Sequence, residues 1–363
     1  MTAPDPTAAL LSLGSGRPEY VGARDTWTRH LAPALVDMEQ ARRDTIQKAR
    51  KRTVRTGLMV LSFVVGSLLV FKGMVLPIAL FFGVIAFVGL AGVAWIPLLS
   101  LKSQTKQLVV GAAAEAFGFD YDTLHPDVSG VSDWRSARGW MKQNIRKGKV
   151  RWGAGQDGPN TCPTPAFDVL KQANCLPSYD RKVFEDLVSG VRAGARFSLV
   201  ECRMTEERGT EKDRRTVTTF QGLLVHIAYP EPFLGRTLIS RQGWWKGLFR
   251  RDGLEKVDLV SRELEDQFDI FSNDQVEARA LLSPDRMERL IALERHFKGG
   301  KLRGVFEDDH LTLALETKNQ FEAGSIWKPL VDSARFASAL EEMGLVCDLI
   351  DGFLTREWVR GRF

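Results

Sequence analysis

The densest group of side chains that could do chemistry is the run Glu307-Asp308-Asp309-His310. Adjacent carboxylates beside an imidazole can bind a divalent cation or exchange protons with a substrate. The run separates two apolar stretches, KLRGVF and LTLALE, and aspartate favours turns because its side chain hydrogen-bonds nearby backbone groups. The pattern therefore favours a hairpin turn, and Asp308, Asp309 and His310 remain the candidate metal ligands.

Catalytic patterns are sparse in the rest of the chain. The five histidines have no HExxH or similar ligand spacing, and neither a GxSxG elbow nor a GxxxxGKS loop is present. Gly153 and Gly155 precede a proline-rich segment rather than a helix, which disfavours a nucleotide-binding loop. The four cysteines form no CxxC pair, as is typical of a reducing compartment without a zinc site. We expect no cofactor and favour a non-enzymatic protein.

A second group combines aromatic and basic side chains between glycines, in SRQGWWKGLFRRDG at residues 240–253. Tryptophan, leucine and phenylalanine beside basic residues suit a segment that enters a headgroup layer with its cations on phosphates. The membrane-surface candidates are Trp244, Trp245, Lys246, Leu248, Phe249, Arg250 and Arg251. A protein partner or sister subunit, or packing onto the domain itself, are the alternatives.

The distribution of charge separates lipid from nucleic acid as the partner. The formal net charge is +5, but the basic excess is concentrated in residues 42–55, 135–151 and 241–251. Residues 255–322 contain 10 Lys and Arg against 16 Asp and Glu, a net charge of −6. Basic segments near a membrane anchor, with an acidic distal body, indicate an anionic leaflet as the partner and no nucleic acid.

The longest apolar block, residues 57–101, indicates where these groups work. Its 45 residues contain a single charge, Lys72. About 20 helical residues cross a hydrocarbon core of roughly 30 Å, so the block suits two crossings, with a turn marked by Lys72, Gly73 and Pro77. The sequence predicts a transmembrane helical hairpin, and a helix pair in a soluble core is the alternative.

Basic residues place both ends of this hairpin on one side of the membrane. Seven lie within residues 42–55, and Lys102 and Lys106 follow the block, whereas the turn offers only Lys72. Positive charge stays on the cytoplasmic side. We therefore expect both termini in the cytosol, at a bacterial inner membrane.

Small residues recur at a spacing of four in both apolar segments, as Ser62-xxx-Gly66 and Ala79-xxx-Gly83. This spacing lets helix backbones approach each other closely. It predicts packing within the hairpin or oligomerisation, and the expected partners are a second copy or another inner-membrane protein.

The pattern divides the chain into six segments. They are a mobile tail over 1–25, an amphipathic basic helix over 26–56, the transmembrane hairpin over 57–101, a helical stalk and basic segment over 102–152, a linker over 153–165 and a cytosolic domain over 166–363. Strand patterns come mostly first in the last segment and helical ones late, which predicts an α+β fold with a mainly antiparallel sheet.

Two short acidic motifs are explained by local backbone structure rather than by a functional site. Glu185 and Asp186, in PSYDRKVFEDLVSG, form a second carboxylate pair in a stretch that predicts a short helix or an extended entry, and acidic residues favour helix N-termini anyway. Asp274 precedes the helical pattern VEARALL, so we expect it to cap that helix, with Glu277 completing a capping box.

Five blocks within residues 184–324 follow one another in order: FEDLVSG, RFSLVECRM, TFQGLLVHIAYPEPFLGRTLIS, FDIFSNDQVEARALLSPDRMERL and GVFEDDHLTLALETKNQFEAG. Their most specific words are F-x-G-L at 220–223, G-x-T at 235–237 and D-Q-V-E-A-R at 274–279. The series resembles the bacterial membrane-protein family catalogued as domain of unknown function 3137. The resemblance implies an apolar hairpin before a cytosolic α+β region, and it implies no activity. The tryptophan-rich loop lies outside the family pattern.

Together these patterns predict a membrane-anchored cytosolic interaction or scaffold module that is oligomeric and touches the anionic inner leaflet. The competing hypothesis is a membrane-tethered enzyme with a carboxylate or metal site, for which the acidic turn supplies the candidate residues.

Overall fold

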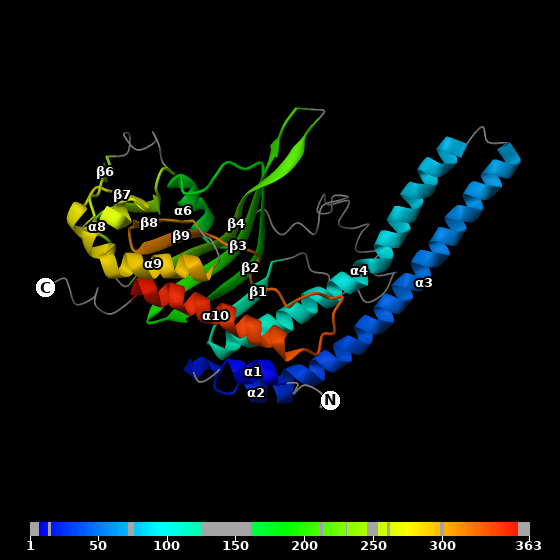
Figure 1. Cartoon of the computed structure of the whole chain (residues 1–363), viewed down its shortest axis with the longest axis horizontal. Coiled ribbons are helices and arrows are strands. Elements are labelled where there is room, and N and C mark those ends of the chain that lie inside the picture. Colours follow the sequence, from blue (N-terminus) through cyan, green and yellow to red (C-terminus); the bar gives the residue numbers. More distant parts are fainter. Residues whose placement is uncertain are drawn as a thin grey trace.

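Two long helices run side by side out of one end of the protein in the computed structural model (Figure 1). They are α3 (Ala32–Phe71) and α4 (Leu76–Ala116), and Pro97 lies inside α4. The structure describes residues 7–13, 16–71, 76–124, 161–210, 213–229, 231–244, 253–259, 262–297 and 301–354. We use the name arm for the outer parts of the two helices, residues 54–71 and 76–93.

The two helices of the arm pack antiparallel through glycine. Gly57 of α3 lies against Phe87 of α4, and Gly83, further along α4 towards its start, lies against Val60 and Val64. A Cβ on Gly83 would come within 3.1 Å of Val60, so the missing side chain sets how closely the helices approach.

The chain before α3 folds against the body. Its elements are α1 (Ala8–Ser12), the 3-10 turn η1 (Pro18–Tyr20), α2 (Ala23–Thr26) and the π-helical turn η2 (Trp27–Leu31), which continues into α3. Leu10 and Trp27 are buried, and the Trp27 ring stacks on Phe336 with 6.5 Å between centroids. Residues 7–25, predicted to be a mobile tail, thus include helical turns, because their apolar side chains find a core to enter.

A nine-stranded sheet forms the body, in the order β1-β2-β3-β4-β9-β8-β5-β7-β6 with every pair antiparallel. The strands are β1 (Asp120–Thr123), β2 (Arg181–Arg192), β3 (Ala195–Arg208), β4 (Arg215–Ala228), β5 (Thr237–Arg241), β6 (Glu255–Lys256), β7 (Phe268–Ser272), β8 (Leu302–Glu307) and β9 (His310–Glu316). The ends of β3 and β4 project from the body as a ribbon (Figure 1).

Alternation along the strands divides the core between the two faces of the sheet. Leu199 and Leu313 enter the larger cluster with the helices α9 (Pro284–His296) and α10 (Ser333–Leu354), whereas Val200 and Ala314 enter the smaller one with α6 (Ala166–Gln172). The short helices α7 (Arg262–Glu265) and α8 (Gln275–Leu281) complete the fold near β7.

The predicted fold class is confirmed at this level: a mixed α+β protein with a long N-terminal helical region and a large antiparallel sheet. Two details are refined. Strand β1 lies within the segment predicted as stalk, and residues 181–192 are strand β2, the extended one of the two predicted alternatives. The hairpin predicted after the helical segment is present as β8 and β9, which follow α9. Most of the predicted basic segment and linker, residues 125–160, lies outside the described residues.

The close approach of β4 and β9 at Gly222 gives a test of this packing. A Cβ there would lie 2.0 Å from the Leu315 carbonyl oxygen, so we expect Gly222→Ala to destabilise the fold by about 1–3 kcal/mol through overpacking. Gly111→Ala is the matched control, because its Cβ would meet Tyr121 at an ordinary 3.9 Å within α4. Thermal melting of both variants in detergent measures the difference, and equal melting temperatures would contradict the strand register.

Candidate functional site: the junction between the arm and the sheet

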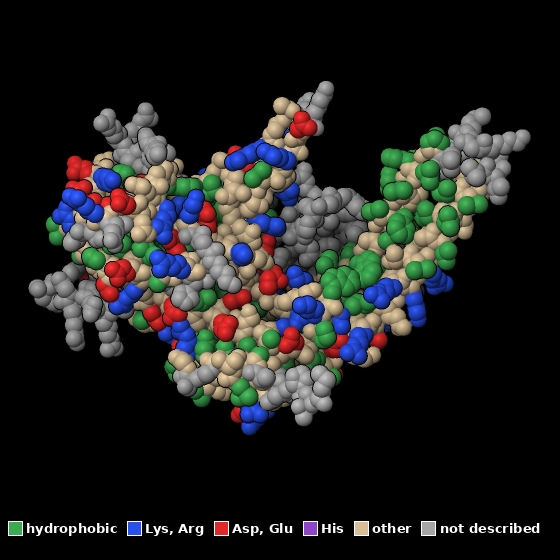
Figure 2. All heavy atoms as spheres, viewed as in Figure 1, with side chains coloured by type: hydrophobic (Ala, Val, Ile, Leu, Met, Phe, Trp, Pro, Cys, Tyr) green, Lys and Arg blue, Asp and Glu red, His purple; other side chains and the backbone are tan. Residues whose placement is uncertain are grey.

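The arm presents an apolar surface to its surroundings. Figure 2 shows hydrophobic side chains covering it, with lysine and arginine gathered at its base. Its exposed large side chains are Val54, Leu58, Met59, Leu61, Phe63, Val65, Ile78, Leu80, Phe81, Phe82, Val84, Ile85, Val88 and Leu90. Such a surface is far larger than the isolated apolar patches that soluble monomers tolerate.

One helix among the described residues, Leu80–Ala116, is long and apolar enough to cross a membrane, and 28% of its apolar window is buried. The sequence predicted two crossings, so the described part of the chain supplies one candidate span rather than two. The side chains of residues 68–71, at the end of α3, lie outside the described part of the chain.

Burial begins abruptly where α4 reaches the body. Leu90 is 61% exposed, whereas Ala94, Ile96 and Leu98 are 3–5% exposed. At this level the Trp95 ring meets the Trp327 ring, with 5.4 Å between centroids. Trp327 belongs to residues 320–331, which we name the junction loop, between β9 and α10.

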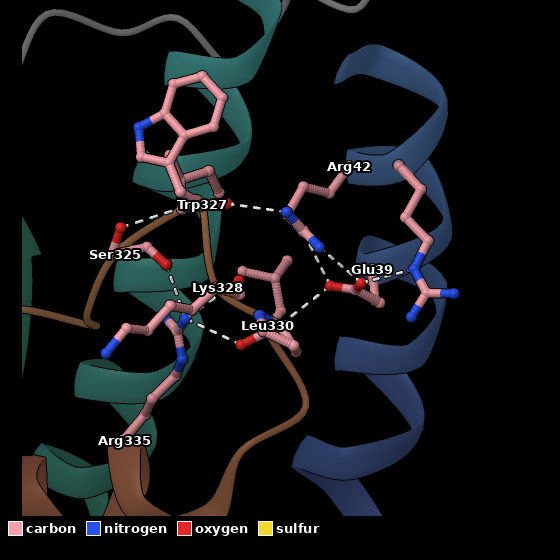
Figure 3. A network of polar contacts seen from close by, with 10 residues as sticks. Glu39, Arg42, Ser325, Trp327, Lys328, Leu330 and Arg335 are labelled. Carbon is pink, nitrogen blue, oxygen red and sulfur yellow. Dashed lines mark hydrogen bonds and ion pairs between the residues drawn. The ribbon is translucent and has the colours of Figure 1, made fainter. Parts of the chain in front are cut away.

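Glu39 and Arg42 of α3 hold the far end of the junction loop (Figure 3). Arg42 donates two hydrogen bonds of 2.8 Å to the Glu39 carboxylate and one of 3.1 Å to the Ile326 carbonyl. The same carboxylate accepts the Leu330 backbone N–H at 3.0 Å. The hydrogen bonds from Arg42 lower the pKa of Glu39 to about 2, against the opposing effect of burial. The carboxylate therefore stays charged across the physiological range.

Arg335 of α10 holds the middle of the junction loop from the other side (Figure 3). Its guanidinium donates to the carbonyl of Ala323 and, at 2.7–3.3 Å, to three further carbonyls of the loop, those of Ser325, Lys328 and Pro329. Gly324 has φ +80°, and a Cβ there would lie 2.9 Å from the guanidinium. A loop without regular structure is thereby fixed in one shape, since its carbonyls are bonded.

Two buried acids hold the start of the junction loop. Glu201 of β3 accepts the Gln320 N–H at 3.0 Å, and Glu342 of α10 accepts the Phe321 N–H at 2.6 Å. Burial raises the pKa of Glu201 to about 10, and the nearby charge of Asp186 adds to this effect. Burial likewise raises the pKa of Glu342 to about 7. Glu201 is therefore protonated at neutral pH, and its second oxygen is buried without a hydrogen-bond partner among the described residues.

An ion pair beside these acids ties α4 to the sheet. The Lys106 ammonium lies 2.6 Å from the Asp186 carboxylate, and the Tyr121 hydroxyl donates to the other carboxylate oxygen at 2.7 Å. Both charges are nearly inaccessible to water, at 3% and 0% side-chain exposure. Burial lowers the pKa of Lys106, but the charges of Asp186 and Glu322 outweigh it and raise that pKa above its ordinary value.

A β-bulge aims Asp186 into this cluster. The pairing of β2 with β3 shifts between Phe184 and Leu187, and the bulge turns Asp186 to the face on which α4 lies. The Glu185-Asp186 pair therefore sits within strand β2, and not at the helix N-terminus that sequence reasoning offered. Glu185 points elsewhere and lies 3.4 Å from Arg203.

The predicted membrane-surface loop is described only at its start. Trp244 is half-buried against the smaller core, donates its indole N–H to the Asn174 carbonyl at 3.0 Å, and lies 3.9 Å above the Arg303 guanidinium. This packing favours the alternative in which the ring belongs to the domain, and a lipid contact for Trp244 stays a prediction. The other candidates lie outside the described residues: Trp245, Lys246, Leu248, Phe249, Arg250 and Arg251.

The small residues of the arm divide into two kinds. Gly83 packs against α3, whereas a Cβ on Gly66 would meet no described residue within 4 Å. Positions 62 and 66 lie two residues from Val60 and Val64, which turns them to the opposite face of α3. The Ser62 hydroxyl donates to the Leu58 carbonyl. The side chain of Ala79 lies outside the described part.

The acidic turn is a tight hairpin between β8 and β9. Asp308 takes φ 53°, and its carbonyl and that of Asp309 accept the N–H groups of Phe233 and Tyr229 at 2.5 and 2.7 Å. His310 lies 2.5 Å from the Asp309 carboxylate and stacks on another histidine ring. No group of three or more histidine, cysteine or acidic side chains with metal-binding geometry occurs among the described residues. Asp308, Asp309 and His310 thus have hairpin contacts in this structure.

Two of the specific sequence words meet each other in space. Asp274 caps α8 as expected, accepting the N–H groups of Val276 and Glu277. Glu277 does not complete a capping box, however. Its carboxylate accepts the N–H groups of Leu234 and Gly235 at 2.9 and 2.8 Å, so D-Q-V-E-A-R holds the turn of G-x-T.

Sequence reasoning missed the residues of the junction. Asp186, Glu201, Arg335 and Glu342 carry the contacts described above, and none was a predicted site residue. One sequence signal could have identified them, a charged residue inside an apolar run, as Glu201 is in SLVECRM. A charged residue is buried in a core only when it has partners there.

Comparison with known proteins supports the sequence resemblance. Residues 218–354 match the family described as "Protein of unknown function (DUF3137)", which confirms the resemblance from β4 to the end of α10. The matched span includes the junction loop. No curated protein matches the chain.

A solved structure is also similar in part, the crystal structure of the mycobacterial trehalose monomycolate transport factor A, TtfA. It is 11% identical, with coverage of 69% of this chain and 96% of that chain, and its TM-score is 0.29. At this score the likeness carries no argument about fold or function.

The raised pKa of Glu201 predicts how the fold responds to pH. The folded state holds a proton that the unfolded chain releases above its ordinary pKa near 4.5, so this group lowers stability progressively from about pH 4.5 towards pH 10. Glu201→Gln keeps an acceptor for Gln320 and removes the titration. We expect it to melt higher than the unmodified chain at pH 8 and at a similar temperature at pH 4.5. An advantage that does not grow with pH would contradict the assignment.

Proposed function

We propose that this protein is a membrane-anchored interaction module, whose arm is embedded in a bilayer as a hairpin and whose sheet domain works at the cytosolic face. The observation that carries the proposal is the apolar surface of the described arm, in which Arg55 at the start is the one charged residue described, directly above a base rich in lysine and arginine (Figure 2). Water would solvate such an arm poorly, whereas the hydrocarbon of a bilayer would solvate it well.

The dimensions of the arm support this assignment. At a rise of 1.5 Å per residue, the helix from Leu76 to Ala94 is about 27 Å long, and α3 from Thr56 to Phe71 is about 23 Å long. A hydrocarbon core is roughly 30 Å thick. The shorter helix would reach both interfaces by local thinning of the bilayer and by extension of its flanking basic side chains.

Charge supports the orientation. Exposed basic side chains on α3 below the arm include Lys48, Arg50 and Lys51, Arg55 lies at the start of the arm, and Lys102 lies below it on α4. Under the positive-inside rule this base faces the cytoplasm of a bacterial inner membrane, with both termini on that side. The base would also attract the anionic lipids of the inner leaflet.

The use of charge at the junction favours an interaction module over a tethered enzyme. Lys106, Asp186, Glu201 and Glu342 bond to one another or to backbone groups of the junction loop, as structural ties do. We propose that association is the module's role, with a second copy or another membrane protein at the outward face of Ser62 and Gly66, where α3 leaves room.

Lysines in the arm test the membrane assignment. Ile85→Lys with Val88→Lys adds two charges at the exposed surface of the described arm, at about 2.5–3.5 kcal/mol each in a bilayer centre. We expect the variant to leave the membrane pellet on alkaline carbonate washing. Val276→Lys, at an exposed site on α8, is the control and should stay in the pellet. A double-lysine variant that remains integral would refute the anchor.

The two glycine faces of the arm predict different defects. Gly83→Leu should separate α3 from α4 and lower the melting temperature in detergent, because its Cβ alone would crowd Val60 at 3.1 Å. Gly66→Leu should leave melting unchanged, since its face is open, but should reduce cross-linking between copies or to a membrane partner in native membranes. Unchanged cross-linking by Gly66→Leu would remove this face as the contact.

A further inference from the structure

The apex of the junction loop exposes a tryptophan on a rigid support. Trp327 is 60% exposed, and its neighbours Lys328 and Pro329 are also exposed. Exposed tryptophans are uncommon, because the indole is large and mostly apolar. The loop backbone on either side is held by Arg42 and Arg335, as Figure 3 shows, so the ring is presented in a fixed place rather than on a mobile segment.

The contact with Trp95 gives the position of this apex along the arm, and hence its depth relative to the hydrocarbon core. Trp95 directly follows Ala94, the end of the α4 segment that the proposed anchor places in hydrocarbon, and lies about 1.5 Å further along the helix. The polar layer of a bilayer adds roughly 5–7 Å on each side of its hydrocarbon core. With the arm in hydrocarbon, Trp327 lies in the headgroup layer.

Basic and acidic side chains both lie around the apex, and Lys328 is the basic residue next to the indole. Lys328 adjoins Trp327, while Arg43 and Lys102, at 67% and 43% side-chain exposure, lie on the two helices beside the loop. The nearby acids are Asp44, Glu322 and Asp332. Glu322 is occupied by Lys102 and Lys106, at 3.4 and 3.7 Å. Arg43 is paired with Glu39, so the indole and the adjoining exposed ammonium of Lys328 are the groups that match a surface of lipid phosphates.

We propose that the apex of the junction loop, Trp327 with Lys328, is a second contact with the anionic leaflet. This inference rests on the proposed membrane anchor and adds to it a site at which the sheet domain touches lipid. The indole occupies the boundary between headgroups and acyl chains, and the ammonium of Lys328 binds phosphate oxygens.

A second point of attachment would restrict how the domain moves. A hairpin alone leaves the body free to rotate about the arm and to tilt. The apex is bonded to α3 through Arg42 and to α10 through Arg335, so a lipid contact there holds both elements at one distance from the bilayer. The surface of the sheet remote from the apex then faces the cytosol in a fixed orientation.

Spin labels in the full chain, reconstituted into vesicles, test the proposal. In a Cys162→Ser background a nitroxide is placed at Lys328→Cys, with Ile85→Cys as the reference in the arm and Val276→Cys as the reference in water. The remaining cysteines, Cys175, Cys202 and Cys347, are buried. Collision with a water-soluble nickel complex is compared in vesicles of phosphatidylcholine with and without phosphatidylglycerol.

The expected result is a collision rate at position 328 at least about threefold below that at 276 in anionic vesicles, as for a residue in the headgroup layer. The label at 85 should be shielded in both vesicle types. A label at 328 as accessible as that at 276, with 85 still shielded, overturns the lipid contact and leaves the anchor standing. An accessible label at 85 refutes the anchor itself.

A second experiment tests the side chains of Trp327 and Lys328 directly, with the nitroxide moved to a neighbouring position. With the nitroxide at Val331→Cys, we expect Trp327→Ala combined with Lys328→Glu to raise nickel collision in anionic vesicles, because both lipid contacts are removed. Unchanged collision would mean that the loop lies near the bilayer without binding it, and would overturn the proposal. Shielding at 328 that appears only after a membrane extract is added would assign the apex to a protein partner instead.

Discussion

The buried backbone groups of the junction loop need hydrogen-bond partners, and this requirement organises the protein around the loop. Residues 320–331 have no regular structure of their own, and buried backbone groups without partners cost free energy. Glu201, Glu342, Arg335, Arg42 and Glu39 supply the partners, from the sheet, α10 and α3. One short segment therefore fixes three elements relative to each other.

The buried pair of Lys106 and Asp186 selects one register of α4 on the sheet more than it adds to the stability of the fold. Such a pair contributes little compared with apolar side chains of the same size, but removing one partner leaves an uncompensated charge. Because Tyr121 also donates to Asp186, α4, β1 and β2 meet at a single point. Any shift of α4 along the sheet would break both contacts, so one register is favoured. The proton on Glu201 lowers the negative charge that Lys106 must balance.

Local patterns made much of this fold predictable, and long-range pairing made the rest unpredictable. The apolar arm, the late hairpin and the Asp274 cap each depend on residues a few positions apart. The junction depends on partners far apart in the chain, such as Glu39 with Leu330 and Lys106 with Asp186, 291 and 80 residues apart. A single sequence carries no signal for such distances. The sequence favoured lipid for the aromatic ring of Trp244 over a core, although both surroundings are apolar.

Pro97 has a mechanical consequence for an arm that enters a bilayer. A proline within a helix removes the hydrogen bond to the carbonyl four residues earlier, here Val93, and that carbonyl lies at the level where burial of α4 begins. The helix is therefore softest to bending there. In a membrane of different thickness the outer segment can lean while the inner segment keeps its seat on the sheet. Pro97 would thus act as a flexible hinge, so that the tilt of the arm in the bilayer can change without a change in the orientation of the sheet domain.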